Sequence, residues 1–252
     1  MALSHLILLT LLFFATSVVG VVTGSNSLIT VPVMFQLGID EKVAVATNMF
    51  GLTFMAIGGT IPFVRQGRIE FRKLTPLIVL TMAGSAVGAM LVGLITNQSI
   101  KLIVTISMIA MIIFSLTRPR PADTIDRPSS VRRPISVVTY LLAFLLAIYG
   151  GLYSGGYVTV LTAVLVTFAA MNFSESVAAT KFINVFSSGI ATLVFMWQGL
   201  VDYRLGLFLG VSMFVGAYLG AHYASRMDEI WLRRIFLATV FVLAIKTMLD
   251  FV

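Results

Sequence analysis

Long apolar runs separated by short polar connections make up most of the chain. Each long run approaches the roughly 20 residues needed to cross about 30 Å of hydrocarbon as a helix. Two shorter runs, 27–37 and 157–170, are too brief to span comfortably and predict half-helices or re-entrant segments. The pattern predicts an all-α polytopic membrane protein with two short segments and about eight long transmembrane helices: 2–22, 43–62, 74–95, 100–117, 135–153, 176–197, 205–225 and 231–250.

Composition supports this class. Hydrophobic residues form 59% of the 252 positions and charged residues only 11%, against roughly 25% charged residues in soluble domains. The chain has no cysteine, which excludes thiolate chemistry, disulfides and cysteine-based metal sites. The net charge is +7, and the basic residues lie mainly in short loops between apolar runs. This placement indicates membrane topology instead of nucleic-acid binding. No cofactor or metal is expected.

The chain divides into two halves that resemble each other. A hydrophilic stretch with four of the seven prolines predicts a linker over 118–134, between a first transmembrane repeat (1–117) and a second (135–252). An offset of 133 places "VAVATN" (43–48) on "SVAATK" (176–181). Further along, an offset of 132 places Gly67, Arg72, Gly84, Gly88, Ala89 and Ile103 on Gly199, Arg204, Gly216, Gly220, Ala221 and Ile235. Matching glycines and polar loop ends favour a duplication over chance similarity of apolar sequence.

Basic residues predict that the repeats insert in opposite directions. The loop 65–73 carries four basic residues, whereas its counterpart 198–204 carries one; for 96–101 and 225–234 the imbalance is reversed. If the richer loops and the linker are cytoplasmic, twelve of seventeen basic residues face the cytoplasm and both termini face outward. Inverted repeats are common in secondary transporters, whose binding sites lie at the repeat interface.

Each short segment is preceded by a polar, glycine-containing break. These breaks are "TGSNS" (23–27) and "SGGY" (154–157). A helix that begins inside the membrane offers free N–H groups that attract anions, although an ordinary tight turn would have the same sequence. The breaks supply six candidate binding residues: Gly24, Ser25, Asn26, Gly155, Gly156 and Tyr157.

Lys181 lies inside the apolar run 176–197. A charge there costs about 2.5–3.5 kcal/mol on insertion scales, so it should face a cavity or a partner. The alternative is that the long side chain extends to the cytoplasmic surface. No carboxylate lies well inside a long run, and Glu175 is six residues away, off the favourable spacing. Asn184 and Ser188 share a face with Lys181, and Thr180 precedes it; we favour an oxyanion site.

Two patterns of small residues, "GSAVG" (84–88) and "GAYLG" (216–220), allow close helix packing. We expect packing within one chain, and a homodimer stays open.

At the residues described above, the sequence resembles the TauE/SafE family, also called the sulfite exporter or 4-toluene sulfonate uptake permease family. The resemblance is clearest in "AVATNMFGLTFMAIGGTIPFVRQGRIEF" (44–71), "SVAATKFINVFSSGIATLVFMWQGLVDYRLG" (176–206) and "GAYLGAHYA" (216–224). The family often has Thr-Asn-Lys in the first repeat, where this chain has Thr47, Asn48 and Met49. In the second repeat Thr180, Lys181 and Asn184 match.

The resemblance implies transport of sulfite, sulfonates, sulfoacetate or related anions across the bacterial inner membrane. Because Met49 replaces a common lysine, a less charged substrate, or one with an apolar end, would fit this chain.

Two other classes are disfavoured. A membrane enzyme lacks its parts, because the chain has two histidines and neither an HExxH nor a GxSxG motif. An anion channel would be expected to show a ring of charged residues, and the sequence offers none.

The direction of transport stays open. An uncoupled anion carrier exports, since each anionic charge gains about 2.3 kcal/mol per 100 mV on leaving, whereas uptake needs a coupling ion such as H⁺ or Na⁺. The absence of a mid-membrane Asp or Glu favours export. Backbone oxygens at the breaks could instead bind Na⁺ in a cation-coupled uptake permease.

Overall fold

The computed structural model describes residues 3–24, 26–65, 71–117, 135–169 and 171–224. Within these ranges the chain forms helices and no strands, which confirms the predicted all-α class. The linker 118–134 and the expected run 231–250 lie outside the described residues.

Five of the described helices are long and apolar enough to cross a membrane. Both expected short runs are confirmed as short helices, α2 (Ser27–Gln36) and α7 (Tyr157–Phe168). The five candidate spans lie in α1 (Leu3–Thr23), α3 (Glu41–Arg65), α4 (Phe71–Leu94), α8 (Phe173–Trp197) and α9 (Tyr203–Ala224).

The expectation of eight long spans is met only in part. In α5 (Asn97–Thr117) the apolar stretch found is Asn97–Met111, which counts among the shorter ones. The run expected over 135–153 becomes α6 (Val137–Leu152), whose 16 residues extend for about 24 Å. The helix ends there because Tyr153 adopts an extended conformation at the start of the glycine-containing break.

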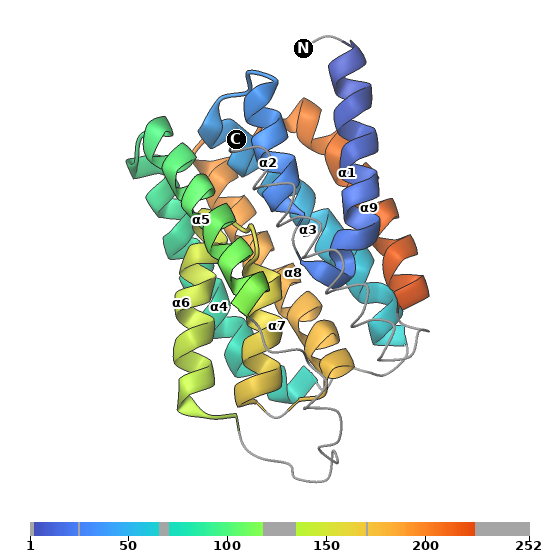
Figure 1. The fold of residues 1–252 in the computed structure, drawn as a ribbon, viewed down its shortest axis with the longest axis vertical. Coiled ribbons are helices and arrows are strands. Elements are labelled where there is room, and N and C mark those ends of the chain that lie inside the picture. The colour runs from blue at the N-terminus through green and yellow to red at the C-terminus, as the bar shows by residue number, and fades with distance from the viewer. Residues whose placement is uncertain (1–2, 25, 66–70, 118–134, 170, 225–252) are drawn as a thin grey trace.

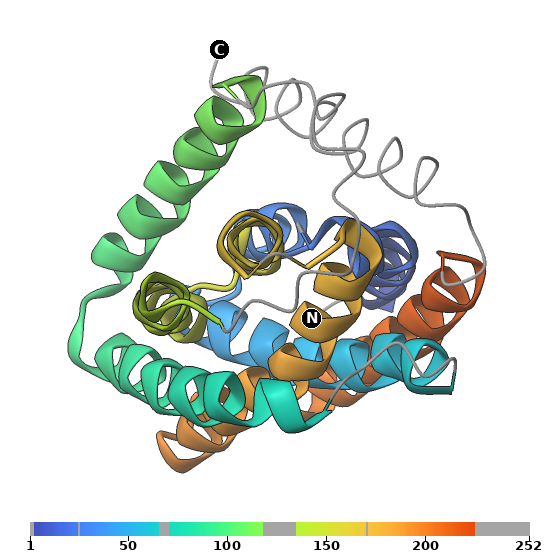
Figure 2. The same cartoon turned by 90° about the horizontal axis from the view of Figure 1, so that it is seen from below.

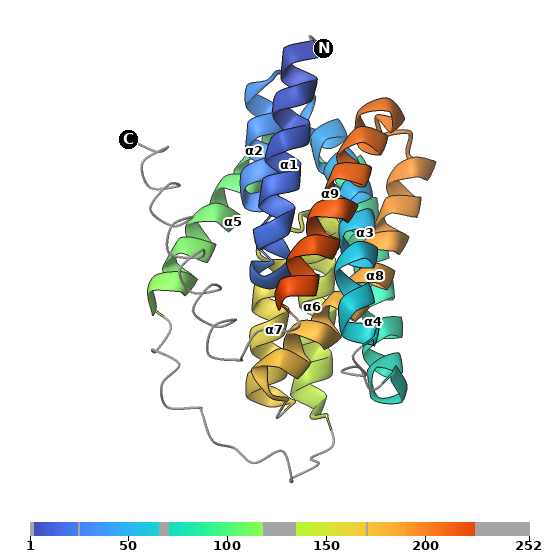
Figure 3. The ribbon, with the colours of Figure 1, turned by 90° about the vertical axis from the view of Figure 1, so that its right-hand side faces the viewer.

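Two helical hairpins enter the bundle from opposite ends. The pair α1–α2 descends from the upper end in Figure 1 and turns back, whereas α6–α7 rises from the lower end, and Figure 3 shows the same arrangement from the side. The tips of the hairpins meet, because the hydroxyl oxygens of Ser27 and Ser154 lie 2.7 Å apart. This meeting point places the polar breaks inside the protein.

The two most buried spans, α3 and α8, form the centre of the bundle. They pack against each other, and α3 also packs against α9 while α8 packs against α4. On the outside, α1 lies along α9 and α6 lies along α4. Viewed from below, α5 lies at the edge of the bundle (Figure 2).

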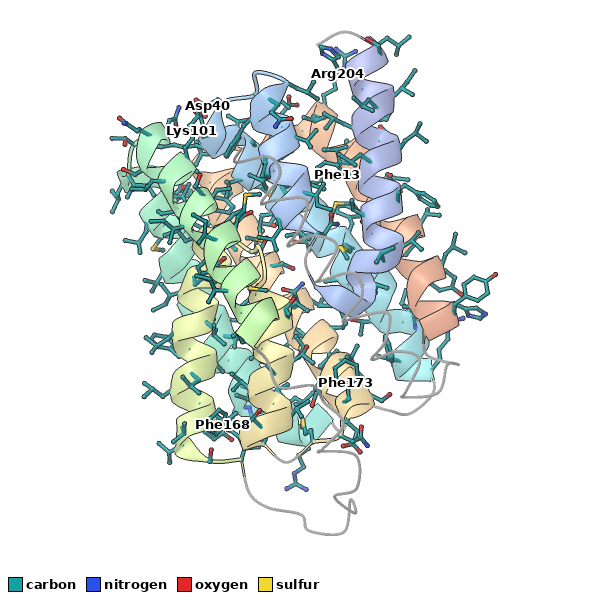
Figure 4. The ribbon with its side chains drawn as sticks, in the orientation of Figure 1. Phe13, Asp40, Lys101, Phe168, Phe173 and Arg204 are labelled. Carbon is teal, nitrogen blue, oxygen red and sulfur yellow. The ribbon has the colours of Figure 1, made fainter. Side chains whose placement is uncertain are left out.

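Polar contacts tie the helix ends together away from the apolar middle. At the upper end of the view in Figure 4, Asp40, Lys101 and Arg204 lie near the helix termini. The Lys101 ammonium pairs with Glu41 at 2.7 Å, and the Asn97 amide donates to Asp40 at 2.5 Å. These contacts join the beginning of α5 to the turn between α2 and α3.

Four glycines allow the outer helices to pack closely. A Cβ atom on Gly88 would lie 2.0 Å from the carbonyl oxygen of Ile148 in α6, and one on Gly220 would lie 2.2 Å from that of Val18 in α1. Gly84 and Gly216 lie one turn earlier and contact the same two helices. The small-residue patterns therefore serve packing within the chain, as expected.

Gly88→Ala should destabilise the protein, because the added methyl group overlaps the α6 backbone, and overpacking of this kind costs about 1–3 kcal/mol. Thermal unfolding in detergent should show a lower midpoint. Gly189→Ala is the matched control, since Gly189 lies within α8 and nothing lies within 4 Å of its added Cβ. Equal midpoints for the two variants would contradict the close packing of α4 on α6.

Candidate functional site

The two helix breaks are in direct contact. Both turns use a glycine with a positive φ, +72° at Gly24 and +82° at Gly156, a conformation that glycine adopts readily. Gly24 lies against the first turn of α7, where a Cβ atom would be 2.7 Å from the Cβ of Val158. The breaks predicted separately from the sequence therefore form one region.

Hydrogen bonds from tyrosines and serines hold this region together. The Tyr153 hydroxyl donates to the carbonyl of Ser27 over 3.0 Å, and the Tyr149 hydroxyl donates to the carbonyl of Gly155. Ser27 and Ser154 add their hydroxyl contact. The predicted site residues do not include Ser27, Ser154 or Tyr153, although all three lie within or next to the two breaks.

Asn48 connects the breaks to α3. Its side-chain carbonyl accepts from the Thr30 hydroxyl at 2.7 Å, and its amide donates to the Ser27 hydroxyl at 2.9 Å. The preceding residue, Thr47, instead accepts from the backbone N–H of Asp202 before α9. Asn48 thus belongs to the polar network of the breaks, and Thr47 belongs to the contact between α3 and α9.

Lys181 reaches from α8 to the end of α1. Only 3% of the residue is exposed, and its Nζ donates to the carbonyl oxygen of Gly20 over 3.3 Å. Gly20 lies in the last turn of α1, where the partial negative charge of the helix dipole favours a cation. The side chain therefore does not extend to the aqueous surface, which excludes that interpretation for this structure.

No carboxylate in the described part of the chain pairs with Lys181. The nearby Glu175 is engaged elsewhere, because its carboxylate accepts from the backbone N–H of Asn172 at 3.1 Å. The Asn172 side chain accepts in return from the backbone N–H of Glu175 at 2.7 Å, completing a capping box at the start of α8.

A small cavity lies beside Lys181. The centre of a water-sized sphere can move within about 20 Å³ of this cavity, so the cavity holds about one water molecule. Its polar lining is Gly20, Gly24, Asn26, Ser27, Ser154, Lys181 and Asn184, and its apolar lining is Leu52, Met55, Ala56 and Val158. The arrangement places a cation, amides and hydroxyls against an apolar wall.

Asn26 brings an unsatisfied polar atom to this cavity. Its amide donates to the Ser17 hydroxyl at 3.0 Å and to the sulfur of Met55 at 3.2 Å. Its side-chain oxygen is buried and has no hydrogen-bond partner among the described residues. A buried unpaired oxygen is costly, so it favours a ligand or a water molecule in this place.

The predicted residues divide into three groups. Gly24, Asn26, Lys181 and Asn184 line the cavity. Ser25 lies outside the described residues. The others lie away from its lining: Thr47, Asn48, Gly155, Gly156, Tyr157, Thr180 and Ser188.

Two residues of the predicted polar face make other contacts. Thr180 accepts from the Thr162 hydroxyl at 3.2 Å, and Ser188 donates to the carbonyl of Asn184 within its own helix. A role in substrate binding remains a prediction for all twelve residues.

A bundle of apolar helices, interrupted at two places and holding a buried lysine there, is typical of multi-pass membrane transporters. The family described as "Sulfite exporter TauE/SafE" matches residues 8–247. The chain therefore belongs to the TauE/SafE family and is a membrane transporter.

Relatives from three bacteria carry transporter names without a substrate. The chain is 28% identical to a "Probable membrane transporter protein ORF9" of Sinorhizobium, over 96% of this chain and 93% of the relative. It is 25% identical to the "Probable membrane transporter protein YfcA" of Escherichia coli, over 97% and 91%. For a "Probable membrane transporter protein" of Haemophilus influenzae the identity is 23%, over 96% and 95%. No solved structure matches the chain.

Gly24→Ala should impair both stability and transport. The left-handed backbone costs about 1–2 kcal/mol for a residue with a side chain, and the methyl group would also overlap Val158. Gly38→Ala is the matched control, because Gly38 has φ +77° and nothing within 4 Å of an added Cβ. The unfolding midpoint and the transport activity should both fall further for Gly24→Ala. Equal losses for Gly24→Ala and Gly38→Ala would mean that the close contact with Val158 adds nothing, and that Gly24 serves only an ordinary turn.

Proposed function

We propose that this protein is a secondary transporter of sulfur-containing anions such as sulfite, sulfonates or sulfoacetate in the bacterial inner membrane. The substrate binds where the two helix breaks meet, and the site opens alternately to the two sides. The contact between Lys181 and Gly20 carries the proposal, because it places a buried cation beside a cavity at the tips of both hairpins.

The chemistry around the cavity suits an oxyanion with an apolar part. An ammonium group has three donors, of which the described residues engage one, through Gly20. Charge-assisted hydrogen bonds to oxyanions are the strong ones. Leu52, Met55 and Val158 also line the cavity and offer apolar surface.

The site carries a single positive charge. The position equivalent to Lys181 in the first half is Asn48, which is neutral and bonded to Ser27 and Thr30. Met49 is buried at 2% exposure and does not line the cavity. These features support a monoanion, or an anion whose other end is apolar, as the substrate.

The helix packing supports two inverted repeats. The glycines of α4 pack on α6, at the carbonyls of Phe144 and Ile148, and the glycines of α9 pack on α1, at the carbonyls of Phe14 and Val18. Each half thus packs its fourth helix on the first helix of the other half. Phe144 lies 130 positions after Phe14, and Ile148 lies 130 positions after Val18. The shared offset is what a duplicated interface requires.

The size of the cavity favours alternating access. A space for about one water molecule cannot hold a sulfonate, so the helices around it must separate before the substrate enters. The hairpins enter the bundle from opposite ends, and residues of both tips line the cavity. Separation of one tip at a time would expose the site to one side.

Lys181→Met should weaken substrate binding about ten- to hundredfold. The loss corresponds to one charge-assisted hydrogen bond, about 1.5–3 kcal/mol. The measurement is the dissociation constant for sulfite or a sulfonate on purified protein, with radiolabelled flux in proteoliposomes as the functional readout. Lys101→Met is the matched control, because this side chain is 59% exposed and pairs with Glu41. An unchanged constant for Lys181→Met would remove Lys181 from the site.

The inverted topology can be tested at equivalent positions. Arg72, exposed in the first turn of α4, corresponds to Arg204, exposed in the first turn of α9, and these helices begin at opposite ends of the bundle. In the cysteine-free chain, Arg72→Cys should be protected from an impermeant thiol reagent in intact cells, and Arg204→Cys should react. Labelling of both from one side would contradict the inverted repeats.

A further inference from the structure

We propose that Lys181 also carries the coupling proton, so that each anion crosses the membrane together with one H⁺. This inference rests on the proposed function, because it assigns a second task to the lysine of that anion site. It gives the transporter a proton carrier inside the membrane, although no Asp or Glu lies well inside a long run.

The surroundings of Lys181 favour the neutral amine in the empty site. The residue is 3% exposed, and a carbonyl oxygen is the acceptor that the described residues offer it. A buried charge without a counter-charge is costly, and such a group tends to become neutral instead. A bound anion supplies the missing counter-charge, so the proton and the anion each stabilise the binding of the other.

No other ionisable group lines the cavity in the described part of the chain. On α6 and α7, which pack against α8, and in the break between them, the ionisable side chains are the phenols of Tyr140, Tyr149, Tyr153 and Tyr157. Apart from Lys181, the charged side chains described in α3, α4 and α8 lie at helix ends: Glu41, Lys42, Arg65, Arg72 and Glu175. Lys181 is therefore the group at this site that can change charge when the anion binds.

The equivalent position of the first half holds a side chain that cannot ionise. Asn48 is neutral, accepts one hydrogen bond and donates another within the network of the breaks. Lys181 makes its single bond at the edge of the cavity instead. A polar anchor alone would need no ionisable group in this place.

The charges balance over one cycle. The empty carrier presents the neutral amine, takes up H⁺ on Nζ, and binds the anion against the resulting ammonium. On the opposite side the anion leaves, the proton follows, and the neutral amine returns. For a monoanion the loaded and empty sites both carry no net charge, so the pH gradient drives transport and the membrane potential does not. An acidic exterior then drives uptake.

The test uses purified protein in proteoliposomes with radiolabelled methanesulfonate and benzenesulfonate. These sulfonates stay ionised near neutral pH, so proton movement cannot come from the substrate itself. With the potential clamped at zero, an exterior one pH unit more acidic should drive about tenfold accumulation, as one proton per anion requires. A pH-sensitive dye inside the vesicles should report acidification that accompanies anion entry.

Lys181→Arg separates the proton role from the anion role. A guanidinium group keeps its proton in proteins, so this variant should still move the anion, with weaker binding, but should lose acid-driven accumulation. Lys101→Arg is the matched control and should accumulate like the wild type, since Lys101 lies at the surface. If Lys181→Arg proves inactive, the ratio of protons to anions measured on the wild type decides the question.

The outcomes distinguish the two proposals. Anion flux that responds to the potential or to a Na⁺ gradient, but not to pH, would overturn the proton role and leave the anion transporter standing. Absence of sulfite and sulfonate flux under every gradient would overturn the proposed function together with the proton role.

Discussion

The structure depends on the contact between two interrupted helices in the middle of the bundle. Inside a bilayer every freed backbone group must find a partner within the protein, so a single break would leave polar groups facing lipid. Here each break helps to satisfy the other, because Tyr153 and Ser154 of one contact Ser27 of the other. The central helices α3 and α8 close around this contact, and Asn48 and Lys181 are the polar side chains they direct toward it. The polar centre is thus a consequence of the two hairpins meeting.

Much of the fold follows from elementary patterns. Apolar runs predict the helices, and the glycine-containing breaks predict where α2 and α7 begin, because backbone preferences and apolar length are local properties. The run expected over 135–153 ends one residue after α6, because Tyr153 is apolar but already extended. At the site, Lys181 and Asn184 could be selected because charge and amides are conspicuous in an apolar run. Ser27 and Ser154 could not, because small hydroxyl residues are common in such helices and their importance comes from a contact between residues 127 positions apart.

The two proposed repeats differ in charge at positions that the offset of 133 makes equivalent. Asn48 completes a hydrogen-bonded network, whereas Lys181 reaches across to the other hairpin. A second lysine beside the first would add repulsion between like charges whenever both side chains are protonated. A single ammonium group needs less negative charge nearby to stabilise it. The C-terminal carbonyls of α1 provide part of that negative charge through Gly20. The asymmetry suits a site that alternates between an empty state and one holding a single negative charge.

The contacts that must change during transport differ in kind from those that must persist. The glycine-lined interfaces of α4 on α6 and of α9 on α1 have backbone carbonyls within 3 Å of where a methyl group would lie, and packing of this closeness resists gradual separation. The contacts at the hairpin tips are single hydrogen bonds: one between the Ser27 and Ser154 hydroxyls, one from Tyr153 to the Ser27 carbonyl, and one from Lys181 of α8 to Gly20 of α1. An incoming oxyanion or water could replace their acceptors. We infer that the outer helix pairs move as units and that the polar contacts at the tips exchange partners. The substrate itself would then supply the hydrogen bonds that the opening of the site removes.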